Sequence, residues 1–182
     1  YDNNDLRTID PSYLRSNVSV VTSRDYFSNS SIKENLMLPL LTHDIGRMDW
    51  AIDKAGAREF IKSLDQGIET KLTSNASNIS SGQKQLLALA RGLITNPKVI
   101  ILDDALTQLG PEMEFNIIKT LQSLKEARTV ILISNQVWHL QLCDKIIVLE
   151  DAGVKESGGW NELMSKDTYI KSKMNQLESF MS

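Results

Sequence analysis

The sequence predicts an α/β fold in which a mainly parallel sheet carries an inserted α-helical subdomain. The short run Val99–Leu102 is entirely apolar, which is typical of a strand buried on both faces of a parallel sheet. Helical patterns fill most of residues 28–95 ahead of it. Asp103 and Asp104 stand directly after the apolar run, at the end of the strand where open α/β sheets bind ligands. The same run therefore predicts the fold class and the edge of the sheet that carries a site.

The first predicted elements are a strand and the helices of the insertion. Residues Asn17–Thr22 form the strand, and the insertion follows from about residue 28. Within it we expect helices near Asp49–Ala55 and Ala57–Leu64. Ser80 and Gln83 form an S-x-x-Q capping signal, so a further helix is predicted to begin at Ser80 and to close the insertion.

The second half of the chain completes the α/β layer. Pro111 favours a first helical turn, and the helix it begins is predicted to run through about Ala127. Its core-facing positions are Phe115, Ile118, Leu121 and Leu124. The remaining predicted elements are strands over Thr129–Ser134 and Lys145–Glu150, a short return over Val154–Glu156 and a C-terminal helix over Asp167–Met181.

Composition narrows the functional classes. With 182 residues and 41% hydrophobic content, the chain is long enough to bury the core of one domain or most of one. Its net charge of −3 gives no electrostatic case for a nucleic-acid partner. No run of about 18 apolar residues occurs, so no membrane-spanning helix is predicted. We expect the single cysteine, Cys143, to be a packing residue, and His43 and His139 to be surface or internally bonded residues.

The helix start at Ser80–Gln83 is a candidate phosphate site. A helix N-terminus gathers unpaired N–H groups and a partial positive charge, and here Ser80 adds a hydroxyl while Gly82 permits close approach. Taken alone, the same four residues, Ser80, Ser81, Gly82 and Gln83, favour an ordinary capped helix. Asp103 supplies a carboxylate of the kind that holds the Mg²⁺ of a nucleoside triphosphate.

Taken together, these motifs resemble a known family. The segment from Ser80 to Asp103 is similar to the signature helix and Walker B strand of an ABC-transporter ATPase domain, with the pattern LSGGQ-x-QR-x-x-x-ARAL…hhhhDE. Ser31–Asn35 is similar to the TIRENI stretch of exporter-type members, and Val130–Ser134 resembles the strand that leads to the switch histidine. The resemblance implies a P-loop NTPase-like fold, with ATP and Mg²⁺ as ligands.

The sequence lacks one defining motif of that family. No G-x-x-x-x-G-K-[ST] occurs, so the loop that cradles the β- and γ-phosphates is not in these residues. We therefore expect residues 1–182 to be a partial ATPase domain in which the N-terminal part of the core is missing. Residues 28–95 are its helical signature subdomain, and 1–27 with 96–182 form the α/β core and C-terminal helix. A naturally deleted pseudo-ATPase is the alternative.

Several matched positions carry a different residue from the family. The Q-loop glutamine, which touches Mg²⁺ and the attacking water, corresponds to Ser23, whose side chain is too short for that contact. The catalytic glutamate corresponds to Asp104, one methylene shorter, and the switch histidine to Asn135, which donates a hydrogen bond but carries no proton at neutral pH. Gly110 and Ser74 replace acidic residues of the D-loop and of the loop before the signature.

The resemblance implies a nucleotide-binding domain of an exporter, and these departures predict that its hydrolysis is weak or partner-dependent. The alternatives are an inactive structural or regulatory subunit and a relative without a transport role. In the family two such domains sandwich ATP head to tail, so the signature here would serve the ATP of a second domain, in a homo- or heterodimer. Ser81 adds a side chain close to that phosphate, so this role stays open.

The resemblance also implies a transmembrane partner, fused or separate, at the cytoplasmic face of a membrane. Either docking to that partner or plain core packing explains five apolar residues: Tyr26, Phe27, Leu36, Met37 and Leu38. Because the P-loop strand is central in the family's sheet, we expect unpaired strand edges and a chain that does not fold alone.

Overall fold

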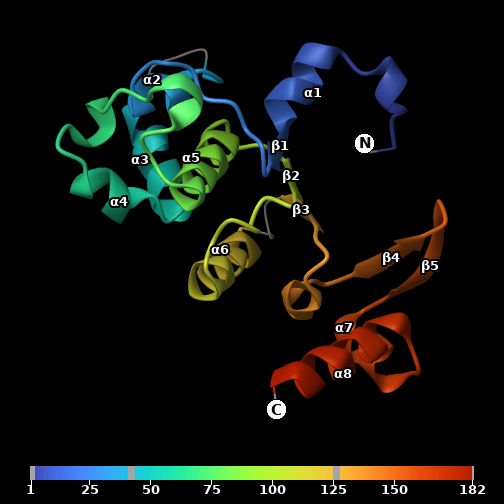
Figure 1. Cartoon of the computed structure of the whole chain (residues 1–182). Coiled ribbons are helices and arrows are strands. Elements are labelled where there is room, and N and C mark those ends of the chain that lie inside the picture. Colours follow the sequence, from blue (N-terminus) through green and yellow to red (C-terminus); the bar gives the residue numbers. More distant parts are fainter. Residues whose placement is uncertain (1–2, 41–43, 125–127, 182) are drawn as a thin grey trace. The chain divides into compact units, whose positions relative to one another are not determined.

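The computed structural model describes residues 3–40, 44–124 and 128–181, with side chains described through residue 176 (Figure 1). Contacts divide the chain into two compact units, Tyr1–Ile133 and Ser134–Ser182. Each unit is described by itself below.

A three-stranded parallel sheet organises the first unit. Its strands are β1 (Val18–Thr22), β2 (Val99–Asp103) and β3 (Thr129–Ile133), in the order β1-β2-β3. The register aligns Thr22 with Asp103 and Asp103 with Ile133, so the carboxyl ends of all three strands meet at one edge. The predicted parallel α/β sheet is confirmed.

The sheet starts one residue later than predicted because a helix comes first. Helix α1 (Pro11–Asn17) takes Asn17, which the sequence assigned to the strand. Asp10 caps this helix, since its Oδ1 accepts hydrogen bonds from the amides of Ser12 at 2.8 Å and Tyr13 at 3.1 Å. A short 3-10 helix, η1 (Leu6–Thr8), precedes it.

Helix α5 (Ser81–Ile94) packs against one face of the sheet at very short range. A Cβ added to Gly92 would lie 2.5 Å from Cγ2 of Val21 and 2.9 Å from Oγ of Ser19 on β1. Leu87, Ala90 and Leu93 are fully buried in the same helix. Gly92 thus sets how closely the helix approaches the sheet.

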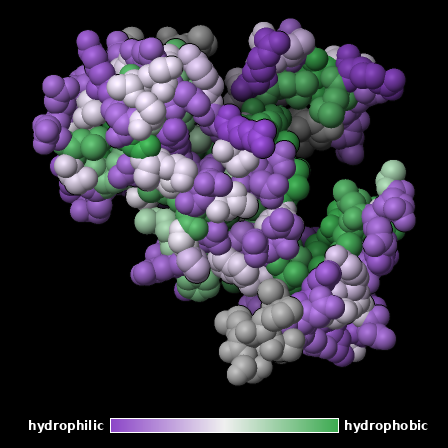
Figure 2. All heavy atoms as spheres, in the orientation of Figure 1, coloured by the Kyte–Doolittle hydropathy of each residue, from purple (hydrophilic) through white to green (hydrophobic). Residues whose placement is uncertain are grey.

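The opposite face of the sheet is apolar and open. Val20 on β1 and Ile131 on β3 project from this face, in register through Ile101 of β2, and both are exposed, as is Ile133. In Figure 2 green atoms gather along the strands, whereas polar and apolar atoms are interspersed over α2 to α4. The described part of the chain therefore leaves large apolar side chains uncovered on this face.

Helix α6 (Pro111–Ser123) corrects one predicted core position. Ile118 and Leu121 are buried as expected and Leu124 is partly buried, but Phe115 is 40% exposed, with Lys119 Nζ 4.4 Å from its ring centroid. The helix buries the face that carries Ile117 instead. The predicted end at Ala127 lies outside the described residues.

Short helices fill the insertion between β1 and β2. They are α2 (Ile32–Met37), α3 (Ile45–Lys54), α4 (Arg58–Ser63) and the 3-10 turns η2 (Gly67–Glu69) and η3 (Ser74–Ala76). Helix α3 begins four residues before the predicted start at Asp49, because the Asp44 side chain caps it by accepting from the Arg47 amide at 3.0 Å. Both α2 and α3 pack against α5. That residues 28–95 form a separate subdomain remains a prediction.

The second unit consists of a hairpin and helices around its own small core. Strands β4 (Ile146–Glu150) and β5 (Gly153–Gly158) are antiparallel, and the other elements are η5 (Val137–Leu142), α7 (Trp160–Ser165) and α8 (Tyr169–Met181). The core residues are Val137, Ile146, Leu163 and Ile170.

Two predicted packing roles fall in this unit. Cys143 packs against the core cluster, as expected. His139 is buried, and its Nδ1 lies 2.7 Å from Oγ of Ser134, so it is an internally bonded residue. The other histidine, His43, lies outside the described residues.

Candidate functional site

The carboxyl edge of the sheet brings three predicted site residues together. Ser23 directly follows β1, Asp103 ends β2, and Asp104 comes next. All three are exposed, and Thr22 pairs with Asp103 in register. This edge therefore presents one hydroxyl and two carboxylates to solvent.

Asp104 is held in an uncommon backbone conformation. Its φ is +49°, in the left-handed region that aspartate tolerates better than most residues. Its amide donates to the carbonyl of Ile133 at 3.1 Å, and its carbonyl accepts from the Thr107 hydroxyl at 3.0 Å. These two hydrogen bonds hold the backbone of Asp104 in this conformation.

The donor set at this edge fits a nucleotide-bound Mg²⁺ better than a metal held by protein alone. Within residues 3–40, 44–124 and 128–181, no group of three or more His, Cys, Asp or Glu side chains is placed to hold a metal ion. Mg²⁺ commonly takes one or two carboxylates and completes its shell with phosphate oxygens and water. Asp103 meets that requirement as an exposed carboxylate at a strand end.

The signature turn is formed as the capping signal predicts. Ser80 is the N-cap of α5: its Oγ accepts from the Gln83 amide at 3.2 Å, and Gln83 Oε1 accepts from the Ser80 amide at 2.9 Å. The first-turn amides of Ser81 and Gly82 have no carbonyl partner within the helix. A helix N-terminus of this kind attracts an anion.

Gly82 has a structural role that the sequence did not reveal. A Cβ at this position would lie 3.1 Å from the carbonyl oxygen of Gln108 and 3.8 Å from Cδ2 of Leu109. The first turn of α5 therefore packs directly on the turn that follows Asp104. Glycine at position 82 thus has two reasons: the predicted close approach to a phosphate, and this packing against the turn.

Gly110 differs from Gly82 in this respect. It is the N-cap of α6 with an ordinary φ of −76°, and a Cβ built on it meets no atom within 4 Å. The packing around position 110 leaves room for a larger side chain. No steric reason therefore explains why this position carries glycine where the family has an acidic residue.

Two side chains of α5 anchor the loop that contains Ser23, and the sequence analysis missed both. Gln85 Nε2 donates to the carbonyl of Thr22 at 3.1 Å, and Arg91 Nη1 donates to the carbonyl of Tyr26 at 2.7 Å. The signal was available: Gln85 and Arg91 occupy the second Q of LSGGQ-x-QR and the R of ARAL. We call residues 22–27 the β1 exit loop.

The half-buried guanidinium of Arg91 lies between a carboxylate and an aromatic ring. Its Nη2 lies 3.5 Å from Oδ1 of Asp25, and its Cζ lies 4.6 Å from the centroid of the Phe27 ring. Burial lowers the pKa of the Arg91 guanidinium, and the charge of Asp25 opposes that shift. The guanidinium remains protonated at neutral pH.

The candidate docking residues separate into two groups. Phe27 and Leu36 are fully buried, and Met37 is partly buried, so core packing accounts for them. Tyr26 and Leu38 are 69% and 66% exposed. Only these two large apolar side chains of the set face solvent.

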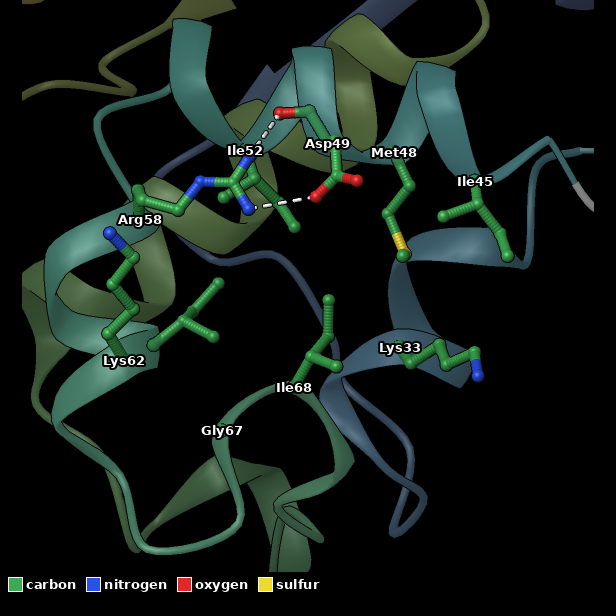
Figure 3. A pocket seen from close by; sticks show the side chains of 10 residues that line it. Lys33, Ile45, Met48, Asp49, Ile52, Arg58, Lys62, Gly67 and Ile68 are labelled. Atoms are coloured by element: carbon green, nitrogen blue, oxygen red, sulfur yellow. Dashed lines mark hydrogen bonds and ion pairs between the residues drawn. The ribbon is translucent and has the colours of Figure 1, made fainter.

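A cavity of about 370 Å³ lies among the insertion helices, apart from the sheet edge (Figure 3). Apolar side chains such as Ile52 and Ile68 line it, with Lys33 and Lys62 at its margin. Arg58 joins α4 to α3 here, since its Nη1 lies 2.8 Å from Oδ1 of Asp49. Hydrogen bonds to Asp53 and Asp49 raise the pKa of Arg58.

Asn135 belongs to the second unit and is exposed. It follows Ser134, whose Oγ accepts from the Gln136 amide at 3.0 Å and also contacts buried His139. The turn that carries Asn135 is thus fixed within its own unit.

Comparisons with known proteins agree with one another. The profile of the family described as ABC transporter matches residues 1–107. "Leukotoxin translocation ATP-binding protein LktB" is 35% identical over 177 residues in both Pasteurella haemolytica-like sp. (strain 5943B) and Mannheimia glucosida. The match covers 97% of this chain and 25% of each relative, so the chain spans about a quarter of their length.

A solved structure is similar over nearly the whole chain. "Structure of a bacterial Atm1-family ABC exporter with ATP bound" superposes with a TM-score of 0.91 at 25% identity. The match covers 97% of this chain and 31% of that one. Among the described residues, no helix combines the length and apolar character needed to cross a bilayer.

Proposed function

Because the chain belongs to the ABC transporter family, as a nucleotide-binding domain with homology to exporter ATP-binding proteins, we propose that it couples ATP binding to transport while hydrolysing ATP weakly. The observation that carries this proposal is the contrast between two turns. The signature turn at Ser80–Gln83 is capped and packed, whereas Asp104 carries a side chain one methylene shorter than glutamate on a backbone held by two hydrogen bonds. We therefore expect the signature turn to keep its role towards phosphate, and the Asp104 carboxylate to fall short of the position that drives hydrolysis.

The ligand of the site is proposed to be ATP with Mg²⁺. Asp103 would hold Mg²⁺, which, when bound, neutralises charge on the phosphate oxygens. Asn135 would donate a hydrogen bond to the γ-phosphate without exchanging a proton. Ser23 adds a hydroxyl at the same strand edge, too short to reach as the family's glutamine does.

The signature is proposed to act on the ATP of a second nucleotide-binding domain. The amides of Ser81 and Gly82 and the dipole of α5 favour an anion at the helix start. The Ser80 hydroxyl and Gln83 amide oxygen are engaged in the capping box, so they shape the turn while the free amides bind. This arrangement implies a homo- or heterodimer.

The transmembrane partner is proposed to dock on Tyr26 and Leu38 at the cytoplasmic face of a membrane. Exposed large apolar side chains beside a fixed loop suit a protein interface, since aromatic anchors carry much interface energy. Whether that partner is fused or separate does not change the prediction.

Hydrolysis by the full-length protein tests the catalytic part of the proposal. We expect slow turnover in the wild type and recovery in the double variant Asp104→Glu/Asn135→His. General-base contributions are typically about 10²–10⁴ in rate, so a recovery of at least about tenfold is expected. Asp151→Glu is a matched control, because Asp151 has the same φ of +49° in an exposed turn. No gain in the double variant overturns the assignment of these two positions.

Binding of labelled ATP separates this proposal from the inactive alternative. We expect saturable binding by the full-length protein, weakened when Asp103→Asn removes the metal ligand. Absence of binding at micromolar ATP would favour a structural or regulatory subunit.

A further inference from the structure

Helix α5 holds the β1 exit loop at both ends. Gln85 reaches the carbonyl of Thr22 at 3.1 Å, where the loop leaves the strand, and Arg91 reaches the carbonyl of Tyr26 at 2.7 Å. The two contacts join segments more than sixty residues apart in sequence, as the pairs 22/85 and 26/91 show. Ser23 lies between the anchored carbonyls.

Burial makes these two contacts strong. Gln85 is only 4% exposed, so an unpaired amide there would lose its hydrogen bonds to water as well as to the loop. The side chains of Arg91 and Asp25 are 19% and 21% exposed, and the ring of Phe27 covers the guanidinium. A charge-assisted bond in such surroundings holds the loop more firmly than a surface contact would.

The same helix carries the signature at its first turn. With a rise of about 1.5 Å per residue, Gln85 and Arg91 lie about 8 Å and about 17 Å along the axis from Ser80. An α-helix of this length transmits a displacement at one end to the other with little bending. The exposed ring of Tyr26 is part of the loop that the far end of α5 holds.

We propose that Gln85 and Arg91 are positioning residues that make α5 and the β1 exit loop move as one body. ATP engaged at Ser80–Gln83 would thereby displace Tyr26 directly. The proposal rests on the function proposed above, and it explains how a domain with Ser23 and Asp104 at its site still drives a partner: the displacement needs neither a Q-loop glutamine nor hydrolysis.

A purely structural role for Arg91 is the competing explanation, and the chain offers a matched control for it. Arg47 of α3 donates through Nε to the carbonyl of Ile94 at 2.8 Å, so it also joins two elements by an arginine-to-carbonyl bond. Its bond ties α3 to the last residue of α5 and does not involve the loop. Arg47→Gln and Arg91→Gln therefore remove equivalent bonds with different consequences.

Hydrogen–deuterium exchange of the full-length transporter in lipid nanodiscs, with and without ATP and Mg²⁺, is the test. Allosteric coupling is typically about 5- to 150-fold, so we expect ATP to slow exchange in residues 22–27 by at least about fivefold in the wild type and in Arg47→Gln. In Arg91→Gln the ATP effect on residues 22–27 should fall below about twofold, while the effect on residues 80–83 persists. Gln85→Met and Asp25→Asn should give the same pattern more weakly, and they replace Arg91→Gln if it fails to fold.

Each result has a definite meaning. If Arg91→Gln or its replacements keep the full response in residues 22–27, the proposal is wrong, although the proposed function stands. If Arg47→Gln loses that response to the same degree, the effect is loss of structure and the proposal is also wrong. If ATP leaves residues 80–83 unprotected in the wild type, the proposed function is wrong. The present inference, which rests on that function, is then wrong as well.

Discussion

Replacing Gly92 with alanine tests how α5 is seated on the sheet. The new Cβ would lie 2.5 Å from Cγ2 of Val21, whereas carbon atoms pack at about 3.5–4.0 Å, so helix and strand would have to separate by roughly 1 Å. Val21 cannot turn aside easily, because it is 1% exposed and β-branched side chains are stiff at χ1. The strain falls on the centre of the core.

Two opposing effects set the magnitude. Overpacking a core position costs about 1–3 kcal/mol, and replacing a helical glycine by alanine returns up to about 1 kcal/mol through helix propensity. The net expectation is a loss of about 1–2 kcal/mol in the free energy of unfolding, or about 2–8 °C in Tm for a domain of this size. Urea denaturation measures the change in the free energy of unfolding, and thermal denaturation measures the change in Tm.

Gly46→Ala provides the matched comparison. Gly46 is also helical, in α3, but its added Cβ would meet only Oδ1 of Asp44 at 3.5 Å, an ordinary contact. Alanine should therefore stabilise the domain there by up to about 1 kcal/mol. If Gly92→Ala proves as stable as Gly46→Ala, the close seating of α5 on β1 is wrong.

Two further predictions concern helix caps. Gly110→Asp should be accommodated without loss of Tm and should add a few tenths of a kcal/mol, because the position is sterically free and aspartate is a better N-cap than glycine; calorimetry of the variant checks this. Glu34 accepts from the amide and hydroxyl of Ser31 at 2.8 and 3.0 Å, and these bonds lower its pKa below the ordinary value of 4.5. A lowered pKa in the folded state gives stability that is present above pH 4.5 and lost as pH falls through the folded value, so Glu34→Gln should flatten the acid limb of Tm against pH. An acid limb identical to the wild type's would contradict this assignment.

Local signals in the sequence predicted local structure well. The S-x-x-Q motif placed the start of α5 correctly, because a capping box involves only residues three apart. The run Val99–Leu102 forms the parallel strand β2 as predicted, although only Ile100 and Leu102 are fully buried because the other face of the sheet is open. Helix α1 was not predicted, although Asp10 and Pro11 form a start signal, and its last residue, Asn17, was assigned to the strand that follows.

What could not be predicted depends on contacts between distant segments. Phe115 has the right spacing for a core face, yet which face is covered depends on what packs against α6. The left-handed φ of Asp104 follows from its bond to Ile133, and the seating of Gly82 on Gln108 follows from the meeting of two turns. Periodicity carries no information on either.

The contact between Gly82 and Gln108 has a consequence for domain exchange experiments. A Cβ added to Gly82 would lie 3.1 Å from the carbonyl oxygen of Gln108, so the first turn of α5 packs on the backbone of the turn after β2. Residues 78–83 and 107–110 thus lie against each other although 23 residues separate them in sequence. A chimera that receives the signature of a relative will seat it correctly only if it also receives that relative's turn. The two segments should therefore be transplanted together.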